Sequence, residues 1–103
     1  MGFEMRDDII FEVIDKTGRK IRLTKKQWSQ ISRKHPQVAS CYEEIIDTLK
    51  NPLKITQSYE ETKYYYYKYF KHKTEPEKYL KVIVKYLNGE GFIITALFDR
   101  KIK

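Results

Sequence analysis

The sequence predicts an α+β fold in which an N-terminal β-hairpin and two helices pack on a four-stranded antiparallel sheet. Two observations carry this prediction: apolar residues recur with helical spacing between residues 24 and 50, and β-branched and aromatic residues dominate after residue 52. The chain has 103 residues, enough for one compact domain, and it contains no internal repeat or low-complexity linker. We therefore assign residues 1–103 to a single domain.

The first helix should follow a short hairpin at residues 8–23, where two β-prone runs flank a Lys-Thr-Gly-Arg turn. Thr24 begins a capping-box pattern, which marks a helix start. Trp28, Ile31 and His35 then share one helical stripe that should face the protein. A proline follows His35 and restricts it to extended geometry, so the helix should end there.

A second helix is predicted over residues 36–50, where apolar residues recur at helical spacing until an Asn-Pro pair ends the pattern. Four strands should follow, at residues 54–59, 63–71, 79–87 and 92–98.

The last two strands are joined by Asn-Gly-Glu-Gly, which suits a three-residue loop with Gly91 in the left-handed position of a bulge. That register puts Lys85 opposite Thr95, with Lys81 further along the same face.

The composition points to an anionic partner, since the net charge is +7 and the sequence pI is about 9.4. The single cysteine, Cys41, excludes an intramolecular disulfide and fits a small buried hydrophobe. We expect no metal or other cofactor, because the two histidines, the cysteine and the carboxylates do not cluster. We also expect a cytoplasmic location, since no run has the length of a membrane span and the N-terminus lacks a signal-peptide pattern.

The end of the first helix is the candidate functional segment. No acidic residue occurs between Asp15 and Glu43, whereas eight basic residues do: Lys16, Arg19, Lys20, Arg22, Lys25, Lys26, Arg33 and Lys34. His35 closes this segment at a helix C-terminus, where the helix dipole should favour an imidazolium. The alternative is a packed histidine with a purely structural role.

These residues suit cleavage of RNA without a metal, which requires a base for the 2′-hydroxyl, an acid for the leaving oxygen and cations around the phosphate. His35 could be the acid or the base, and Lys34 or Arg33 could neutralise the developing charge. Thr95 is a lone hydroxyl in an apolar final strand, although a β-branched residue is also ordinary there.

The tyrosine run at residues 64–69 should place Tyr64 and Tyr66 with Lys68 on one face of a strand, and the other three tyrosines on the opposite face. One face should pack against the helices. The other could stack on RNA bases or form an exposed amphipathic surface.

Several strings together resemble the small phage- and mobile-element-associated members of the barnase–EndoU–colicin–RelE nuclease superfamily. They are, in order, Leu23-Thr24-x-x-x-Trp28-x-x-Ile31-x-x-x-His35-Pro36, Ile45 to Leu49, Asn51-Pro52, Ile55, Lys78-Tyr79-Leu80-Lys81-Val82-x-Val84-Lys85 and Ile94-Thr95-Ala96-Leu97-Phe98.

This resemblance implies N-terminal helices on a four-stranded antiparallel sheet, with His35 and Thr95 in the active site and a lysine or arginine completing it. Colicin-like tRNases place a lysine beside the helix histidine, which here is Lys34. The family often has Thr-Ala-Tyr in its last strand, whereas this chain has leucine as the third residue. Because RelE-like members act within the ribosome, membership alone does not fix the substrate.

The sequence thus predicts a metal-independent endoribonuclease, a toxin in one reading, that cleaves RNA such as tRNA and leaves a 2′,3′-cyclic phosphate. The predicted catalytic residues are His35, Lys34, Thr95 and Lys85. The predicted RNA-binding residues are Lys25, Lys26, Arg33, Lys81, Tyr66 and Lys68. An acidic antitoxin or immunity protein is a second expected partner, and a non-catalytic basic module that binds RNA or protein is the alternative function.

Overall fold

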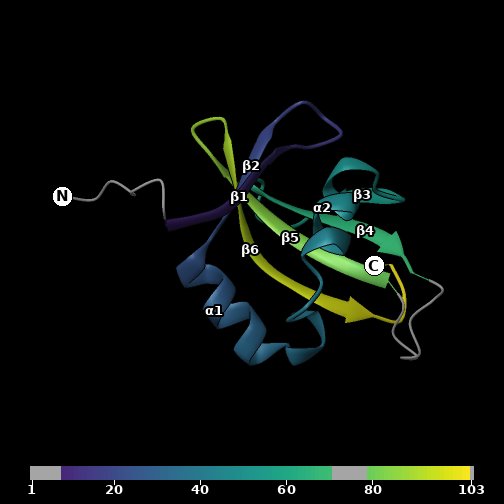
Figure 1. Ribbon diagram of the computed structural model, residues 1–103. Helices are drawn as coiled ribbons and strands as arrows, with labels where there is room; N and C mark the ends of the chain where they lie inside the picture. Colours follow the sequence, from purple (N-terminus) through teal and green to yellow (C-terminus); the bar gives the residue numbers. More distant parts are fainter. Residues whose placement is uncertain (1–7, 71–78, 103) are drawn as a thin grey trace.

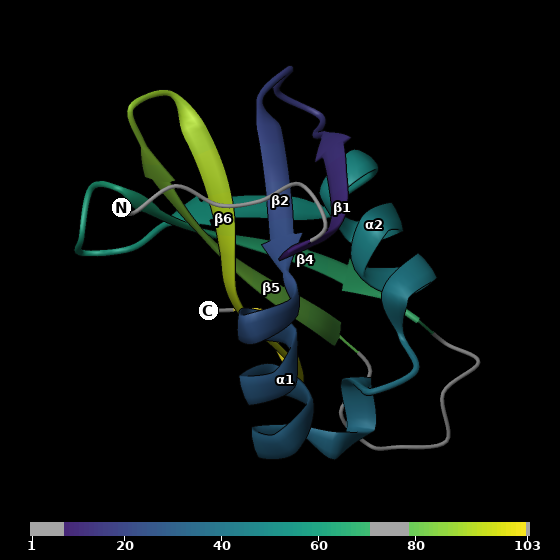
Figure 2. The ribbon, with the colours of Figure 1, turned by 60° about the vertical axis from the view of Figure 1, so that its left-hand side comes forward.

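The computed structural model describes residues 8–70 and 79–102, which form two α-helices packed on a six-stranded mixed sheet (Figures 1 and 2). The strands are β1 (Ile9–Ile14), β2 (Lys20–Thr24), β3 (Lys54–Gln57), β4 (Lys63–Tyr69), β5 (Tyr79–Leu87) and β6 (Glu90–Asp99). The helices are α1 (Lys25–Lys34), the short 3-10 helix η2 (Pro36–Val38) and α2 (Tyr42–Lys50). Neither α-helix of the described chain has the length and apolar character needed to cross a bilayer.

The strand order is β1-β2-β6-β5-β4-β3, and every neighbouring pair is antiparallel except β2 and β6. The α+β class agrees with the sequence, but the predicted four-stranded antiparallel sheet is wrong. The N-terminal hairpin does not pack on the sheet as a separate unit. It extends the sheet, because β2 pairs in parallel with β6 at Ile21↔Gly91 and Arg22↔Phe92.

Gly91 is the reason that this parallel pair can form. A Cβ at this position would lie 2.9 Å from both Ile21 Cγ1 and Tyr86 Cε1. The missing side chain therefore lets β2 and the Tyr86 ring approach β6 from two sides.

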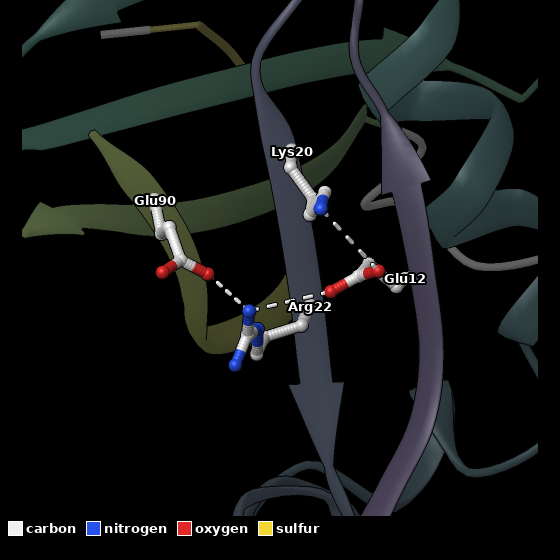
Figure 3. Close-up of polar contacts among 4 residues, drawn as sticks. All are labelled: Glu12, Lys20, Arg22 and Glu90. Atoms are coloured by element: carbon white, nitrogen blue, oxygen red, sulfur yellow. Dashed lines mark hydrogen bonds and ion pairs between the residues drawn. The ribbon is translucent and has the colours of Figure 1, made fainter. Parts of the chain in front are cut away.

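A polar network on the same three strands reinforces the pairing (Figure 3). The Arg22 guanidinium on β2 lies between carboxylates of two neighbouring strands, bonding Glu90 of β6 and approaching Glu12 of β1 at 3.3 Å. Lys20 also approaches Glu12, at 4.0 Å. The network ties both sides of β2 to the sheet.

We expect Gly91→Ala to lower the free energy of unfolding by about 1–3 kcal/mol, the usual cost of overpacking a filled core. Chemical denaturation measures this change, with the exposed Leu87→Ala on the neighbouring strand as the control. Unchanged stability of Gly91→Ala would contradict the close approach of the two strands.

The β5–β6 turn differs from the predicted three-residue loop. Leu87 pairs with Glu90, so the loop has two residues, Asn88 and Gly89, with φ of 54° and 81°. Positive φ at both central positions is the geometry that an Asn-Gly hairpin adopts. Gly91 instead lies inside β6.

The changed turn also changes the register. Thr95 lies opposite Ile83, and Lys85 lies opposite Phe92, so the predicted pairing of Lys85 with Thr95 is wrong. A bulge contributes to the difference, because Val84 pairs with Ile93 while Ile83 pairs with Thr95.

The first helix and its end agree with the prediction, whereas the second predicted helix is divided into η2 and α2. Helix α2 packs on one face of the sheet against β1, β4 and β5, whereas α1 contacts β2 and η2 and runs beside β6 (Figure 1). The buried core between these layers includes Ile21, Leu23, Ile31, Ile45, Leu49, Tyr66, Val82, Val84 and Ile93.

Candidate functional site

A cleft of about 260 Å³ lies between α1 and β6. Parallel pairing with β2 extends along β6 only to Phe92, and the chain of β2 then continues into α1. The helix therefore lies where a further strand would otherwise pair with β6. The cleft is lined by Gln27, Gln30, Ile31, Lys34, His35, Ile94 and Thr95.

Helix α1 delivers Lys34 and His35 to this cleft. The helix begins at Thr24, whose hydroxyl accepts a hydrogen bond from the Gln27 amide at 3.2 Å. It ends at His35, where φ is −129° and ψ is 76° and the backbone N–H donates to the Ile31 carbonyl at 2.7 Å. This geometry lies outside the α region, which the following proline disfavours. The backbone of His35 is thus held at the edge of the cleft, and its half-buried side chain lines the cleft together with Lys34.

The bulge in β6 delivers Thr95. Ile94 is the extra residue between two regular pairs of the β5–β6 ladder, and its carbonyl accepts a hydrogen bond from the Gln27 amide group on α1. Bulges often redirect side chains beside functional sites. Here Ile94 and Thr95 both line the cleft, and Gln27 ties the helix to the bulged segment.

The electrostatics of His35 differ from the sequence-based expectation. Burial lowers the pKa of His35 below its ordinary value of 6.5, and repulsion by the Lys34 charge lowers this pKa further. The helix dipole was expected to favour an imidazolium. In the folded protein, partial desolvation and the neighbouring cation lower the pKa of His35, so the imidazole is neutral at neutral pH and can accept a proton.

Three of the four predicted catalytic residues line the same cleft: Lys34, His35 and Thr95. The fourth, Lys85, is not among the lining residues, since it lies opposite Phe92 on β5. Sequence reasoning missed the amide side chains of Gln27 and Gln30. Their spacing from Lys34 was a usable signal, because residues three, four and seven apart share one helix face.

The predicted RNA-binding residues lie in three places. Lys25, Lys26 and Arg33 are exposed on α1, where Arg33 donates to the Ser29 hydroxyl at 3.3 Å. Lys81 is on β5, and its ammonium lies 4.3 Å from the centre of the Tyr65 ring.

Tyr66 and Lys68 do not form an RNA-facing pair. Tyr66 is 1% exposed, and its hydroxyl bonds a carboxylate in the core. The Lys68 ammonium donates to the Asn51 carbonyl at 3.0 Å and lies 3.5 Å from the Asp47 carboxylate. Tyr66 lies on the face of β4 that is turned toward the core, and it is therefore unavailable for base stacking.

A metal site is not apparent in the described segments, where no three histidine, cysteine or carboxylate side chains gather. The chemistry that the cleft offers is a neutral imidazole, an ammonium, a hydroxyl and two amides around one open volume. Comparisons of the chain with protein-family models, with curated proteins and with solved structures give no match.

Proposed function

We propose that this protein is a metal-independent endoribonuclease that acts in the cleft between α1 and β6. The observation that carries the proposal is that a proton-accepting His35, the Lys34 ammonium and the Thr95 hydroxyl share one cleft of about 260 Å³. The helix and the strand that supply them are distant in the sequence. An acid–base group, a cation and a hydroxyl donor are what cleavage of RNA through its own 2′-hydroxyl requires.

In the proposed reaction, the neutral His35 imidazole accepts the proton of the 2′-hydroxyl, and the 2′-oxygen forms a bond to phosphorus. The bond from phosphorus to the 5′-oxygen breaks, and this oxygen takes a proton from water. The products are a 2′,3′-cyclic phosphate and a 5′-hydroxyl end, and the imidazolium returns its proton to solvent. Lys34 and Thr95 stabilise the charge on the phosphate oxygens.

Exposed Lys25, Lys26 and Arg33 extend positive charge from the cleft along α1, and this supports a nucleic-acid substrate. Lys85 takes no part in the chemistry as proposed here, because it does not line the cleft. A tRNA substrate, a role as a toxin and a cytoplasmic site of action belong to the same proposal. An acidic antitoxin or immunity protein would complement the same basic surface.

The test is to incubate the purified protein with total RNA in EDTA and to analyse the new ends. We expect cleavage to persist in the chelator, and we expect 2′,3′-cyclic phosphates at the 3′ ends because the nucleophile is internal to the RNA. Cleavage that stops in EDTA, or products with other ends, would contradict the mechanism.

The exposed lysines and Arg33 of α1 also favour a second candidate, a basic module that binds RNA or an acidic protein without cleaving anything. This candidate predicts salt-sensitive binding and no product. The same incubation separates the two, because a binding module leaves the RNA intact.

A further inference from the structure

A second hollow lies on the face of the sheet that the described helices leave uncovered. Its volume is about 320 Å³, near the lower end of ligand-sized cavities, which are roughly 300–1,000 Å³. It is lined by Thr56, Gln57, Ser58, Tyr59 and Tyr65, from the end of β3, the following turn and β4.

Two tyrosine rings, those of Tyr59 and Tyr65, line this hollow. Tyr59 is fully exposed in the turn after β3, where an unpartnered ring loses the benefit of burial. Tyr65 is half-buried on β4, and the Lys81 ammonium lies 4.3 Å from its ring centre. A flat, weakly polar ligand with a negative charge nearby suits this combination, because it can stack on the rings and pair with the lysine.

The hollow is joined to the α1–β6 cleft by one row of the sheet. Thr95 lies opposite Ile83, Ile83 opposite Tyr65, and Tyr65 opposite Thr56. These residues share the face of the sheet opposite the core, because their neighbours Tyr66, Val82 and Ala96 are in the core. Thr95 also lines the cleft beside α1. Neighbouring strands lie about 4.8 Å apart, so Thr95 and Tyr65 are about 10 Å apart across the row, a distance that a short stretch of extended RNA can bridge.

The charges beside this row favour a polyanion. Lys81 and Lys85 flank Ile83 on the same face of β5, and no ion pair joins either to another described residue. The carboxylates of Glu12 and Glu90 are already engaged by Arg22, which pairs with Phe92, the partner of Lys85 (Figure 3). The path between the two hollows is therefore apolar and aromatic along its centre and positive at its sides.

We propose that the hollow lined by Tyr59 and Tyr65 is a subsite that stacks one base of single-stranded RNA while the scissile phosphate lies in the α1–β6 cleft. The inference rests on the proposed nuclease function and adds a substrate class, because the subsite can hold a base only when that base is unpaired. The sheet row carries the intervening nucleotides, with Lys81 and Lys85 beside their phosphates. Stacking on tyrosine tolerates every base, so this subsite adds affinity more than sequence preference.

The test is binding of a fluorescent, fully 2′-O-methylated RNA of about eight nucleotides, within the site sizes of about 4–16 nucleotides found for single-strand binders. This probe lacks the 2′-hydroxyl nucleophile, so binding is measured whether or not the protein cleaves RNA. We expect Tyr59→Ala and Tyr65→Ala each to raise Kd about 5- to 150-fold, and the double variant to raise it little more, because both rings contact one base.

Three controls make the result specific. Tyr65→Phe keeps the ring and should bind as the wild type does. Tyr69→Ala removes an exposed ring from the same face of β4, where it lies 5.3 Å from Tyr79, and it should leave Kd unchanged. Ile14→Ala removes an exposed apolar side chain from β1, outside both hollows, and it should also leave Kd unchanged.

Equal binding by wild type and both tyrosine variants would overturn the subsite, and the cleavage assay would then decide the nuclease function separately. Absence of any binding would overturn it as well. A third contrary outcome is a duplex of the same sequence, or polyglutamate, binding as tightly with no dependence on Tyr59 or Tyr65. That result would show that this face of the sheet binds anions through charge alone, as it would bind an acidic protein partner.

Discussion

Replacing His35 by alanine is expected to slow RNA cleavage by about 10²–10⁴-fold, the range that a positioned acid–base group contributes. The fold should survive, because the bond that ends α1 is made by the backbone N–H of residue 35 and not by the imidazole. Initial rates on a defined RNA, with the circular dichroism spectrum of each variant, measure both effects. Gln37→Ala is the matched control, since this exposed residue of η2 follows the end of α1 and does not line the cleft.

The pH dependence gives an independent check of the role of His35. A general base must be neutral to act, and burial together with the Lys34 charge sets the pKa of His35 below 6.5. The rate should therefore be level near neutral pH and should fall as the pH drops through that lowered pKa. Lys34→Gln removes the repulsion, so the pKa should rise and the acid limb should move to higher pH. If the acid limb of the pH–rate profile does not move in Lys34→Gln, then titration of His35 does not control the rate.

The parts of the fold that could be predicted from the sequence are those with local signals. The capping threonine and the proline after His35 define both ends of α1, and the structure confirms them. The parallel pairing of β2 with β6 could not be predicted, because it depends on a contact between Ile21 and Gly91 that no local pattern encodes. Gly91 lies beside a turn and therefore suggested a bulge, but in the structure its missing side chain makes room for the neighbouring strand β2.

The site was predictable to the same degree. Lys34 and His35 follow from the helix end, whereas the orientation of Thr95 depends on a bulge at Ile94 in an apolar run without glycine or proline. The choice of tyrosine face was equally hidden. Alternation separates Tyr65 from Tyr66, but the inward position of Tyr66 depends on core packing and on a buried carboxylate, both far away in the sequence.

That carboxylate belongs to Asp15, which is 5% exposed at the end of β1. It accepts hydrogen bonds from the Thr17 hydroxyl at 2.7 Å, from the Arg19 amide at 2.9 Å and from the hydroxyls of Tyr66 and Tyr86. The network joins the β1–β2 turn to β4 and β5. Since β2 continues into α1, the network also helps to hold the helix that carries the proposed site.

Burial raises the pKa of Asp15, but the hydrogen bonds from Tyr66, Thr17, Arg19 and Tyr86 outweigh it and lower the pKa below the ordinary value of 3.8. A carboxyl with a lowered pKa in the folded state stabilises the protein above pH 3.8, and this contribution is lost as the pH falls through the lower value. The decrease in the free energy of unfolding at acidic pH should therefore depend measurably on Asp15.

We expect Asp15→Asn to lower the free energy of unfolding at pH 7 by about 1–3 kcal/mol for each tyrosine hydroxyl left without its acceptor. Tyr66→Phe removes one donor instead and should cost about 1.5–3 kcal/mol, the contribution of a hydrogen bond to a charged group. Urea unfolding at pH 7 and pH 3 measures both, and Asp15→Asn should lose less stability on acidification than the wild type does. The half-exposed Asp47→Asn is the control, with an expected change of about 0.5 kcal/mol or less. Equal acid sensitivity of Asp15→Asn and the wild type would show that the hairpin, and with it the start of α1, is held by packing alone.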